Sequence, residues 1–168
     1  MPASPVPAFA QVAELPILVD RAVPDEWIDV NGHMNIAHYL DVSSDAVTAF
    51  MNDLGLAQSY RDERGLGVFT AEQHLSYYSE LHAGQRLTAH VRLVGVSSKA
   101  IHLLAFVLDP AHDRLAMVFE TVLVHVDLRA RSAAPVPADL RERLDASAAE
   151  HAGLAWEPPL CGVMGVRG

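Results

Sequence analysis

The sequence predicts an α+β domain in which a strongly curved antiparallel sheet of about five strands surrounds one long helix. Two observations lead to this prediction: the expected elements follow the order strand, helix, four strands, and the connections among the last four strands are short. Strands with hairpin-length connections pair antiparallel, and a single helix with an apolar stripe must be covered by something. At 168 residues, the chain is long enough for one domain with a core and too short for two.

Each element has a local signal. Residues 15–23 are rich in Val, Ile and Leu and stop at Pro24, which predicts the first strand. From Ile36 to Leu54 apolar residues recur at three- and four-residue steps and Gly55 follows, which predicts an amphipathic helix. The charged segment 60–67 is expected to be a connector. The remaining strands are expected at 67–79, 86–97, 99–108 and 114–127.

The strand expected at 86–97 alternates most clearly. Leu87, Ala89, Val91 and Leu93 fall on one side and Thr88, His90 and Arg92 on the other. We therefore divide the chain into a flexible N-terminal tail at 1–13, a main domain at 14–130, and a linker, helix and tail at 131–168. The C-terminal helix is expected at 138–152.

Composition excludes several classes of partner. The formal net charge is −9 and the basic residues are scattered, which argues against a nucleic-acid surface. No apolar run approaches the ~18 residues that a membrane-spanning helix needs. The first 15 residues carry no Lys or Arg and are broken by prolines, unlike a signal peptide, so we expect a cytoplasmic protein with no membrane partner.

The segment "DVNGHMN", residues 29–35, gathers polar groups immediately before the predicted helix. Without further information it is a helix cap and a turn: Asp and Asn accept backbone N–H groups, and Gly32 permits a positive φ. The alternative is a reaction centre built at the start of a helix. His38 is expected to pack or to lie on the helix surface.

The order of elements, with Asp29 and Gly32 as Asp-x-x-Gly at the helix entrance, resembles the hotdog fold of acyl-CoA thioesterases and their 4-hydroxybenzoyl-CoA thioesterase-like branch. The denser "DVNGHMNIAHY" is similar to the Asp-x-Asn-x-His-x-Asn-Asn-x-x-Tyr signature of plant acyl-ACP thioesterases. It departs from that signature at Gly32 and Ile36.

A resemblance over most of the chain rests on "EWIDVNGHMN", "FTAEQHLSYYSELHAGQRLT", and "LVHVD" followed by "PVPADLRERL". These segments are similar to the betainyl-CoA thioesterases of carnitine degradation. The resemblance implies hydrolysis of an acyl-CoA, with betainyl-CoA as the suggested substrate. It also implies a homodimer, or a tetramer of dimers, with active sites across the dimer interface. No cofactor is expected, since coenzyme A is part of the substrate.

Thioester cleavage requires a group that attacks or activates water, donors for the developing oxyanion, and a slot for the acyl chain. Asp29 can serve as general base or as nucleophile, and the resemblance to the plant enzymes adds Asn31 and His33 to a catalytic network. The first N–H groups of a helix lack intrahelical partners, so Gly32, Met34 and Asn35 are expected to form the oxyanion site.

Further contacts are expected elsewhere. Thr70, Glu72 and His74 are separated by two residues each, so on a regular strand they share one face and would meet the substrate or a partner subunit's Asp29. Trp27 and Tyr39 are candidates for packing or for contacts with the acyl group. Arg86, Arg92 and Lys99 would suit the phosphates of coenzyme A.

Other functions remain open at this point. A hotdog dehydratase would use a His and a carboxylate, such as His33 and Glu72, and a non-catalytic acyl-CoA binding or regulatory module would release no thiol. No metal is expected, because the remaining histidines do not form the i, i+4 pair of a helical zinc site. Cys161 has no Cys partner and is expected to be an incidental thiol.

Overall fold

The computed structural model describes residues 5–166, which contain a six-stranded antiparallel sheet. Its strands are β1 (Val19–Ala22), β2 (Leu66–Tyr77), β3 (Arg86–Val96), β4 (Ala100–Asp109), β5 (Arg114–Asp127) and β6 (Ser132–Ala133). Five of them follow the spatial order β1-β3-β4-β5-β2, and the two-residue β6 pairs with the end of β5. The predicted five-stranded antiparallel sheet is confirmed, and β6 is a short addition within the predicted linker.

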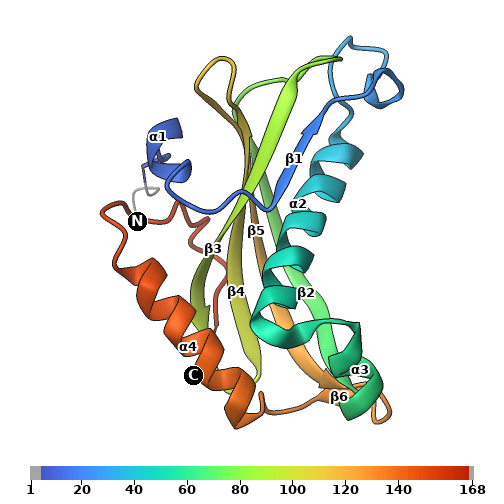
Figure 1. Cartoon of the computed structure of the whole chain (residues 1–168), viewed down its shortest axis with the longest axis vertical. Coiled ribbons are helices and arrows are strands. Elements are labelled where there is room, and N and C mark those ends of the chain that lie inside the picture. Colours follow the sequence, from blue (N-terminus) through green and yellow to red (C-terminus); the bar gives the residue numbers. More distant parts are fainter. Residues whose placement is uncertain (1–4, 167–168) are drawn as a thin grey trace.

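The sheet curves around helix α2 (Ile36–Met51), as Figure 1 shows. The buried residues of α2 include Tyr39, Val42, Ala46 and Met51, whose three- and four-residue spacing places them on one face. They pack with residues of β3, β4 and β5 in the main hydrophobic core. The helix runs into a wider turn at Asn52–Leu56, where Gly55 has φ +101° and ends the helical path. The long helix and its stop at Gly55 are therefore confirmed.

The two faces of the sheet have different covers. On the inner face, which faces α2, Leu87, Val91 and Leu93 of β3 join the main core. On the outer face, His90 and Arg92 are 2% and 5% exposed. The predicted alternation of β3 is confirmed, and both of its sides are buried because both ends of the chain fold across the outer face.

This outer cover corrects the predicted flexible tail at 1–13. Residues Phe9–Val12 form the short helix α1, and Val12 is fully buried with Leu15, Phe106 and Trp156 in a second hydrophobic cluster. The first strand is shorter than predicted for the same reason, since Leu15 leaves the sheet to join this cluster. Residues 1–4 of the expected tail, and 167–168 at the other end, lie outside the described residues.

Two further helices occur at the ends of the sheet. Helix α4 (Ala138–Ala152) has the predicted boundaries and packs mainly against β3. Helix α3 (Gln58–Arg64) replaces the connector expected at 60–67, and it ends at Gly65, whose φ is +64°. The Arg64 guanidinium donates two hydrogen bonds to the Asp139 carboxylate, at 2.9 and 2.7 Å, and so joins α3 to α4.

A β-bulge divides β2 and corrects the predicted shared face of Thr70, Glu72 and His74. The register with β5 shifts between Thr70 and Glu72, so Ala71 is the extra residue. Thr70 pairs with Leu123, which belongs to the main core, and therefore points to the inner face. His74 pairs with Glu120, and Glu72 lies two residues before it, so both point to the outer face.

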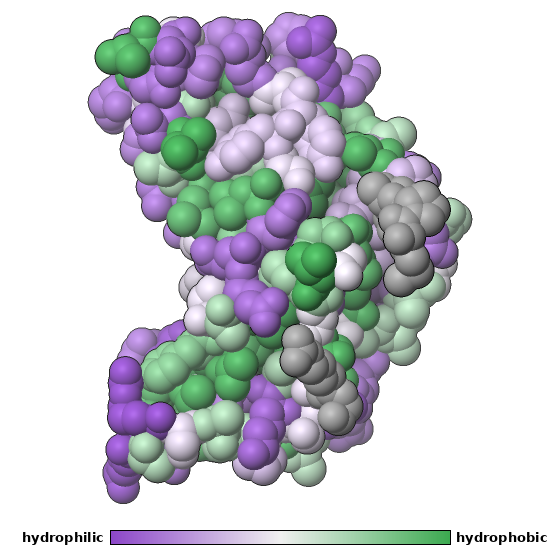
Figure 2. Space-filling model, turned by 180° about the vertical axis from the view of Figure 1, so that it is seen from behind, coloured by the Kyte–Doolittle hydropathy of each residue, from purple (hydrophilic) through white to green (hydrophobic). Residues whose placement is uncertain are grey.

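Figure 2 shows the molecule from behind, with an indentation on one side of its outline and hydrophobic areas on both sides of that indentation.

Among residues 5–166, no helix combines the length and the apolar character that crossing a bilayer requires.

Candidate functional site

The segment before α2 closes into a tight turn around Asp29. The Asp29 N–H donates to the His33 carbonyl and the Gly32 N–H donates to the Asp29 carbonyl, both at 3.0 Å. Gly32 has φ +82°, a conformation that side chains with a Cβ rarely adopt. An isolated antiparallel bridge between Ile28 and Met34 flanks the turn. Hydrogen bonding within the segment therefore holds Asp29 and His33 at the entrance to the helix.

The Asp29 carboxylate accepts two hydrogen bonds from this turn. Its Oδ1 accepts from the Asn31 N–H at 2.8 Å, and its Oδ2 accepts from Asn35 Nδ2 at 3.4 Å. Asn35 also caps α2, because its Oδ1 accepts the Ala37 N–H at 3.0 Å. The expected contact of Asn31 is therefore made by its backbone, and the side chain that orients the carboxylate belongs to Asn35.

His33 does not point its Nδ1 at Asp29. That atom lies 3.2 Å from the Met34 carbonyl oxygen, and because a carbonyl can only accept, Nδ1 carries the proton and donates. In the tautomer with the proton on Nδ1, Nε2 carries no proton and can accept a hydrogen bond. His33 therefore lies beside the Asp29 turn without a hydrogen bond from its Nδ1 to the carboxylate.

The N–H groups of Gly32, Met34 and Asn35, the predicted oxyanion donors, all donate to carbonyl groups within the chain. The Met34 N–H donates to the Leu81 carbonyl at 2.7 Å, and the Asn35 N–H donates to the Trp27 carbonyl at 2.8 Å. The Gly32 N–H closes the turn, as described above. Within residues 5–166, the N–H groups of His33 and Ile36 have no such backbone partner.

His33 and Ile36 border a hollow of about 290 Å³ between the start of α2 and the end of β2. The complete lining is His33, Met34, Ile36, Tyr39, Tyr77, Tyr78, Ser79 and Glu80. Asp29 is not among the lining residues of this hollow. The residues around the hollow therefore carry an imidazole, three phenol rings and one carboxylate, and two of these residues, His33 and Ile36, have N–H groups without a backbone acceptor.

Tyr39 forms the floor of the hollow and is 3% exposed. Its hydroxyl accepts the Leu81 N–H at 3.0 Å, and its ring meets the Tyr77 ring edge-on, with centroids 5.4 Å apart. Burial raises the pKa of Tyr39 to about 12. Tyr39 therefore remains a neutral phenol at physiological pH and contributes an aromatic wall.

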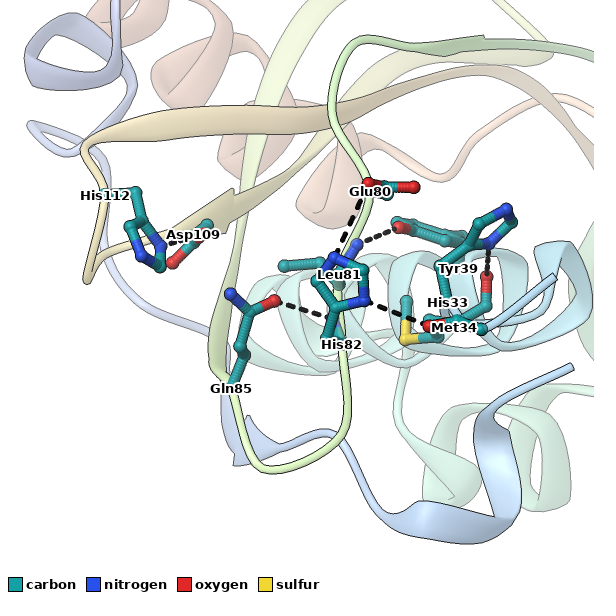
Figure 3. A network of polar contacts seen from close by, with 10 residues as sticks. His33, Met34, Tyr39, Glu80, Leu81, His82, Gln85, Asp109 and His112 are labelled. Carbon is teal, nitrogen blue, oxygen red and sulfur yellow. Dashed lines mark hydrogen bonds and ion pairs between the residues drawn. The ribbon is translucent and has the colours of Figure 1, made fainter.

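Residues 77–82 were not singled out as site residues by the sequence reasoning. The signal was available as two adjacent tyrosines followed by an acid in "SYYSE", at the end of a predicted strand. His82 approaches the turn from this loop: its Nδ1 donates to the Gly32 carbonyl at 3.0 Å, and its Nε2 lies 3.5 Å from Glu80 Oε1. Figure 3 shows His82 between Glu80, Gln85 and the turn that carries His33 and Met34.

Trp27 is a packing residue for the same turn. Its ring stacks on His38 with centroids 4.5 Å apart and an interplanar angle of 5°, and the Arg21 guanidinium lies 4.4 Å from the Trp27 ring centroid. Its carbonyl accepts the Asn35 N–H. The predicted packing role of His38 is therefore confirmed, and Trp27 packs against it.

The three candidate residues of β2 do not reach the tyrosine-lined hollow within one chain. Thr70 lines a second hollow of about 200 Å³, under the end of α2, together with Met51 and Phe119. Glu72 is exposed on the outer face, and His74 lies there beside Glu120.

The arginines suggested for coenzyme A have other partners in the chain. Arg86 donates to the Asp20 carboxylate at 2.8 and 2.6 Å. Arg92 is buried against Trp156 and donates to the Trp156 carbonyl at 2.7 Å.

Sequence comparison identifies relatives for most of the chain. A Pseudomonas aeruginosa betainyl-CoA thioesterase is 34% identical over 135 residues, which cover 80% of this chain and 85% of that protein. An Agrobacterium fabrum L-carnitine dehydrogenase/betainyl-CoA thioesterase is 33% identical over 156 residues, which cover 92% of this chain and 32% of that protein. The chain thus spans about a third of the fused relative.

A structural comparison agrees on the fold. A Staphylococcus aureus protein solved in complex with CoA superposes with a TM-score of 0.80 at 23% identity, covering 91% of this chain and 97% of that one. The family model described as the thioesterase-like superfamily matches residues 23–144, which include the Asp29 turn, α2 and the strands β2 to β5. The chain therefore belongs to the thioesterase-like superfamily and has its hotdog fold.

Proposed function

We propose that the protein is an acyl-CoA thioesterase that hydrolyses betainyl-CoA to the free acid and CoA. Family membership supports the reaction, and the names of the relatives together with the CoA bound to the S. aureus protein support the substrate class. The observation that carries the choice of acyl group is the tyrosine- and glutamate-lined hollow beside His33.

The lining of this hollow suits a trimethylammonium group. Quaternary ammonium ions bind to the faces of aromatic rings, each contact contributing about 0.5–2 kcal/mol, and they cannot donate conventional hydrogen bonds. Tyr39, Tyr77 and Tyr78 supply three rings, and Glu80 supplies a negative charge. Tyr77 and Tyr78 are 46% and 45% exposed, so their rings are accessible to an incoming ligand.

The reaction adds water across the thioester. A water oxygen bonds to the carbonyl carbon and the C–S bond breaks, so CoA leaves as a thiolate that is then protonated. Asp29 is proposed to act at this step, either by taking a proton from the water or by attacking the carbonyl to form an anhydride that water cleaves. The Asn31 N–H and the Asn35 amide hold its two oxygens in place.

Single turnover in H₂¹⁸O can establish attack by Asp29. If Asp29 attacks and water then opens the anhydride at the Asp29 carbonyl carbon, ¹⁸O enters the Asp29 carboxylate and the first product molecule carries an unlabelled oxygen from the enzyme. Label in the product alone, with the peptide containing Asp29 unchanged in mass, is expected when Asp29 activates water or when water opens the anhydride at the acyl carbon.

The developing oxyanion requires donors that are not already used. The N–H groups of His33 and Ile36 meet this requirement, and both residues border the hollow. Ile36 is the first residue of α2, where the helix dipole favours negative charge, and His33 lies three residues before it. We therefore transfer the predicted oxyanion role from Gly32, Met34 and Asn35 to these two groups.

A homodimer is part of the proposal. β2 forms one edge of the sheet, is 12 residues long and has exposed residues at its centre. An unprotected edge of this length presents a row of backbone groups that can pair with a second strand. Pairing of two β2 edges would bring residues of one subunit toward the Asp29 turn of the other. Sedimentation should give twice the mass of one chain, and a stable monomer with full activity would contradict this assembly.

The dehydratase alternative is less well supported. It requires a His and a carboxylate aimed at the same acyl chain, but His33 borders the hollow while Glu72 lies on the outer face of the sheet. A non-catalytic binding module would give no function to the Asp29 carboxylate, which two hydrogen bonds orient, or to the His33 imidazole at the edge of the hollow.

The decisive experiment is thiol release from a panel of acyl-CoAs. The panel should pair betainyl-CoA with 3,3-dimethylbutyryl-CoA, in which a carbon atom replaces the quaternary nitrogen, and should include aromatic and straight-chain esters. We expect the highest kcat/KM for betainyl-CoA. Equal rates for the charged and neutral members of the pair would reject the betainyl proposal, and no hydrolysis of any ester would reject thioesterase activity itself.

A further inference from the structure

We propose that His74, Glu120 and Cys161 form a Zn²⁺ site on the outer face of the sheet, separate from the tyrosine-lined hollow. The three residues come from β2, β5 and the C-terminal segment. One ligand atom from each, namely a ring nitrogen, a carboxylate oxygen and the sulfur, lies within 4.8 Å of the other two.

Two backbone relationships bring these side chains together. His74 and Glu120 are directly opposite each other in the β2–β5 register, so their side chains leave the sheet on the same face. The Cys161 N–H donates to Glu120 Oε2 at 2.7 Å and fixes the C-terminal segment over this pair. The convergence therefore follows from sheet pairing and a main-chain hydrogen bond.

The ligand set is chemically suited to zinc. Zn²⁺ is bound by imidazole nitrogen at about 2.0–2.1 Å, carboxylate oxygen at about 2.0–2.2 Å and thiolate sulfur at about 2.3 Å. Tetrahedral coordination with these bond lengths separates the ligand atoms by about 3.3–3.6 Å. Separations of up to 4.8 Å need to shrink by about an ångström, which rotation of the His74 and Cys161 side chains can provide.

Glu120 also has the support expected of a metal-bound carboxylate. It is 1% exposed, and its Oε1 lies 2.8 Å from Nε2 of His102, which is itself buried. Metal-ligating carboxylates are typically oriented by an outer hydrogen bond of this kind. His102 lies on the neighbouring strand β4, so the sheet presets the position of the least mobile ligand.

The other two ligands, His74 and Cys161, allow an ion to enter from solvent, and the three-residue set leaves one coordination position free. His74 is exposed and Cys161 is partly exposed, so an ion can reach the site from solvent. Three protein ligands leave a fourth position for water. The His74 side chain projects from the face of the sheet, whereas a second subunit would pair with β2 in the plane of the sheet. Dimerisation through the β2 edge would therefore not displace His74. The bound ion would join the C-terminal segment to β2 and β5.

The test is calorimetric titration of the metal-free, full-length protein with Zn²⁺. We expect one ion per chain and an affinity that falls by more than about 100-fold in Cys161→Ser and in His74→Ala, because loss of a mere outer-shell partner costs about 10–100-fold. Both side chains are accessible, so these variants should fold. The matched control is His112→Ala, which removes a half-exposed histidine from another loop and should bind as the wild type does.

Two further measurements separate this site from other modes of binding. Co²⁺ should produce a sulfur-to-metal charge-transfer absorption in the wild type that is absent in Cys161→Ser. Asp29→Asn should bind Zn²⁺ normally whether or not it is active, so the metal proposal is tested independently of the catalytic one. No binding to the wild type, or undiminished binding to both ligand variants, would overturn the proposal.

Discussion

The side chain of Asn35 connects the Asp29 carboxylate to the start of helix α2. Its Nδ2 donates to Asp29 Oδ2 at 3.4 Å, while its Oδ1 accepts the Ala37 N–H at 3.0 Å. One amide therefore caps the helix and orients the proposed catalytic carboxylate. Substitutions of Asn35 that keep or remove the helix cap can separate capping from orientation of the Asp29 carboxylate.

Asn35→Ser should keep the cap and lose the contact with Asp29. Serine is a good N-cap residue, whereas Asn35→Ala loses the cap as well, at a cost of about 1 kcal/mol in the free energy of unfolding. The contact is long for a hydrogen bond to a charged group, so we expect kcat to fall about tenfold in both variants. Steady-state kinetics and denaturant unfolding check this. An unchanged kcat in the serine variant would reduce Asn35 to a cap.

Asp29→Asn should lower kcat about 10²–10⁴-fold, the usual contribution of a general base, with a melting temperature close to that of the wild type. Asparagine can still accept the Asn31 N–H, so the turn should keep its shape. Asp25→Asn is the matched control, because it removes an exposed carboxylate four residues earlier. If Asp29→Asn unfolds while Asp25→Asn does not, Asp29 is a structural residue of the turn.

Much of the fold could be predicted because the signals are local. Strands β3, β4 and β5 begin and end within a residue or so of the predicted positions, since alternation and turn residues lie within each segment. The prediction that Thr70, Glu72 and His74 share one face was wrong because of a single extra residue, Ala71. A bulge at Ala71 depends on how β2 registers with β5, and the sequence of β2 alone carries no signal for that pairing.

The candidate site could be predicted only in part, because some of its features also depend on contacts between segments that are distant in the sequence. The motif identified Asp29 and His33, but whether a backbone N–H is free depends on distant acceptors. The Met34 N–H is taken by the carbonyl of Leu81, 47 positions along the chain, so it cannot serve an oxyanion. The tyrosine-lined hollow likewise forms only when the end of β2 lies against the start of α2.

Acid should destabilise the protein partly through His151. Its Nδ1 accepts the Leu93 N–H at 2.7 Å, which requires an unprotonated Nδ1. Burial lowers the pKa of His151 below its ordinary value of 6.5. The folded chain therefore binds this proton less readily than the unfolded chain, so the stability is fully present above about pH 6.5 and is lost as the pH falls below it.

The measurement is the melting temperature of the wild type and of His151→Gln at pH 7.5 and 5.5. Glutamine can accept the same N–H without titrating, so its melting temperature should fall less over this interval. Some loss should persist, because burial also lowers the pKa of His90. Equal losses in the two proteins would show that His151 does not contribute to the acid sensitivity.

Tyr78→Leu and Glu80→Gln should weaken selection of the cationic acyl group while leaving hydrolysis of its neutral isostere largely intact. Leucine keeps an apolar wall but removes one aromatic face, so KM for betainyl-CoA should rise about 2–30-fold, the equivalent of about 0.5–2 kcal/mol. Glutamine keeps the shape of Glu80 and removes the charge that would attract the ammonium. Neither change touches Asp29 or the N–H groups of His33 and Ile36, so kcat for 3,3-dimethylbutyryl-CoA should stay within about twofold of the wild type. A parallel loss on both substrates would mean that these residues support the turn and not the ammonium group, because recognition of charge must discriminate between esters of equal shape.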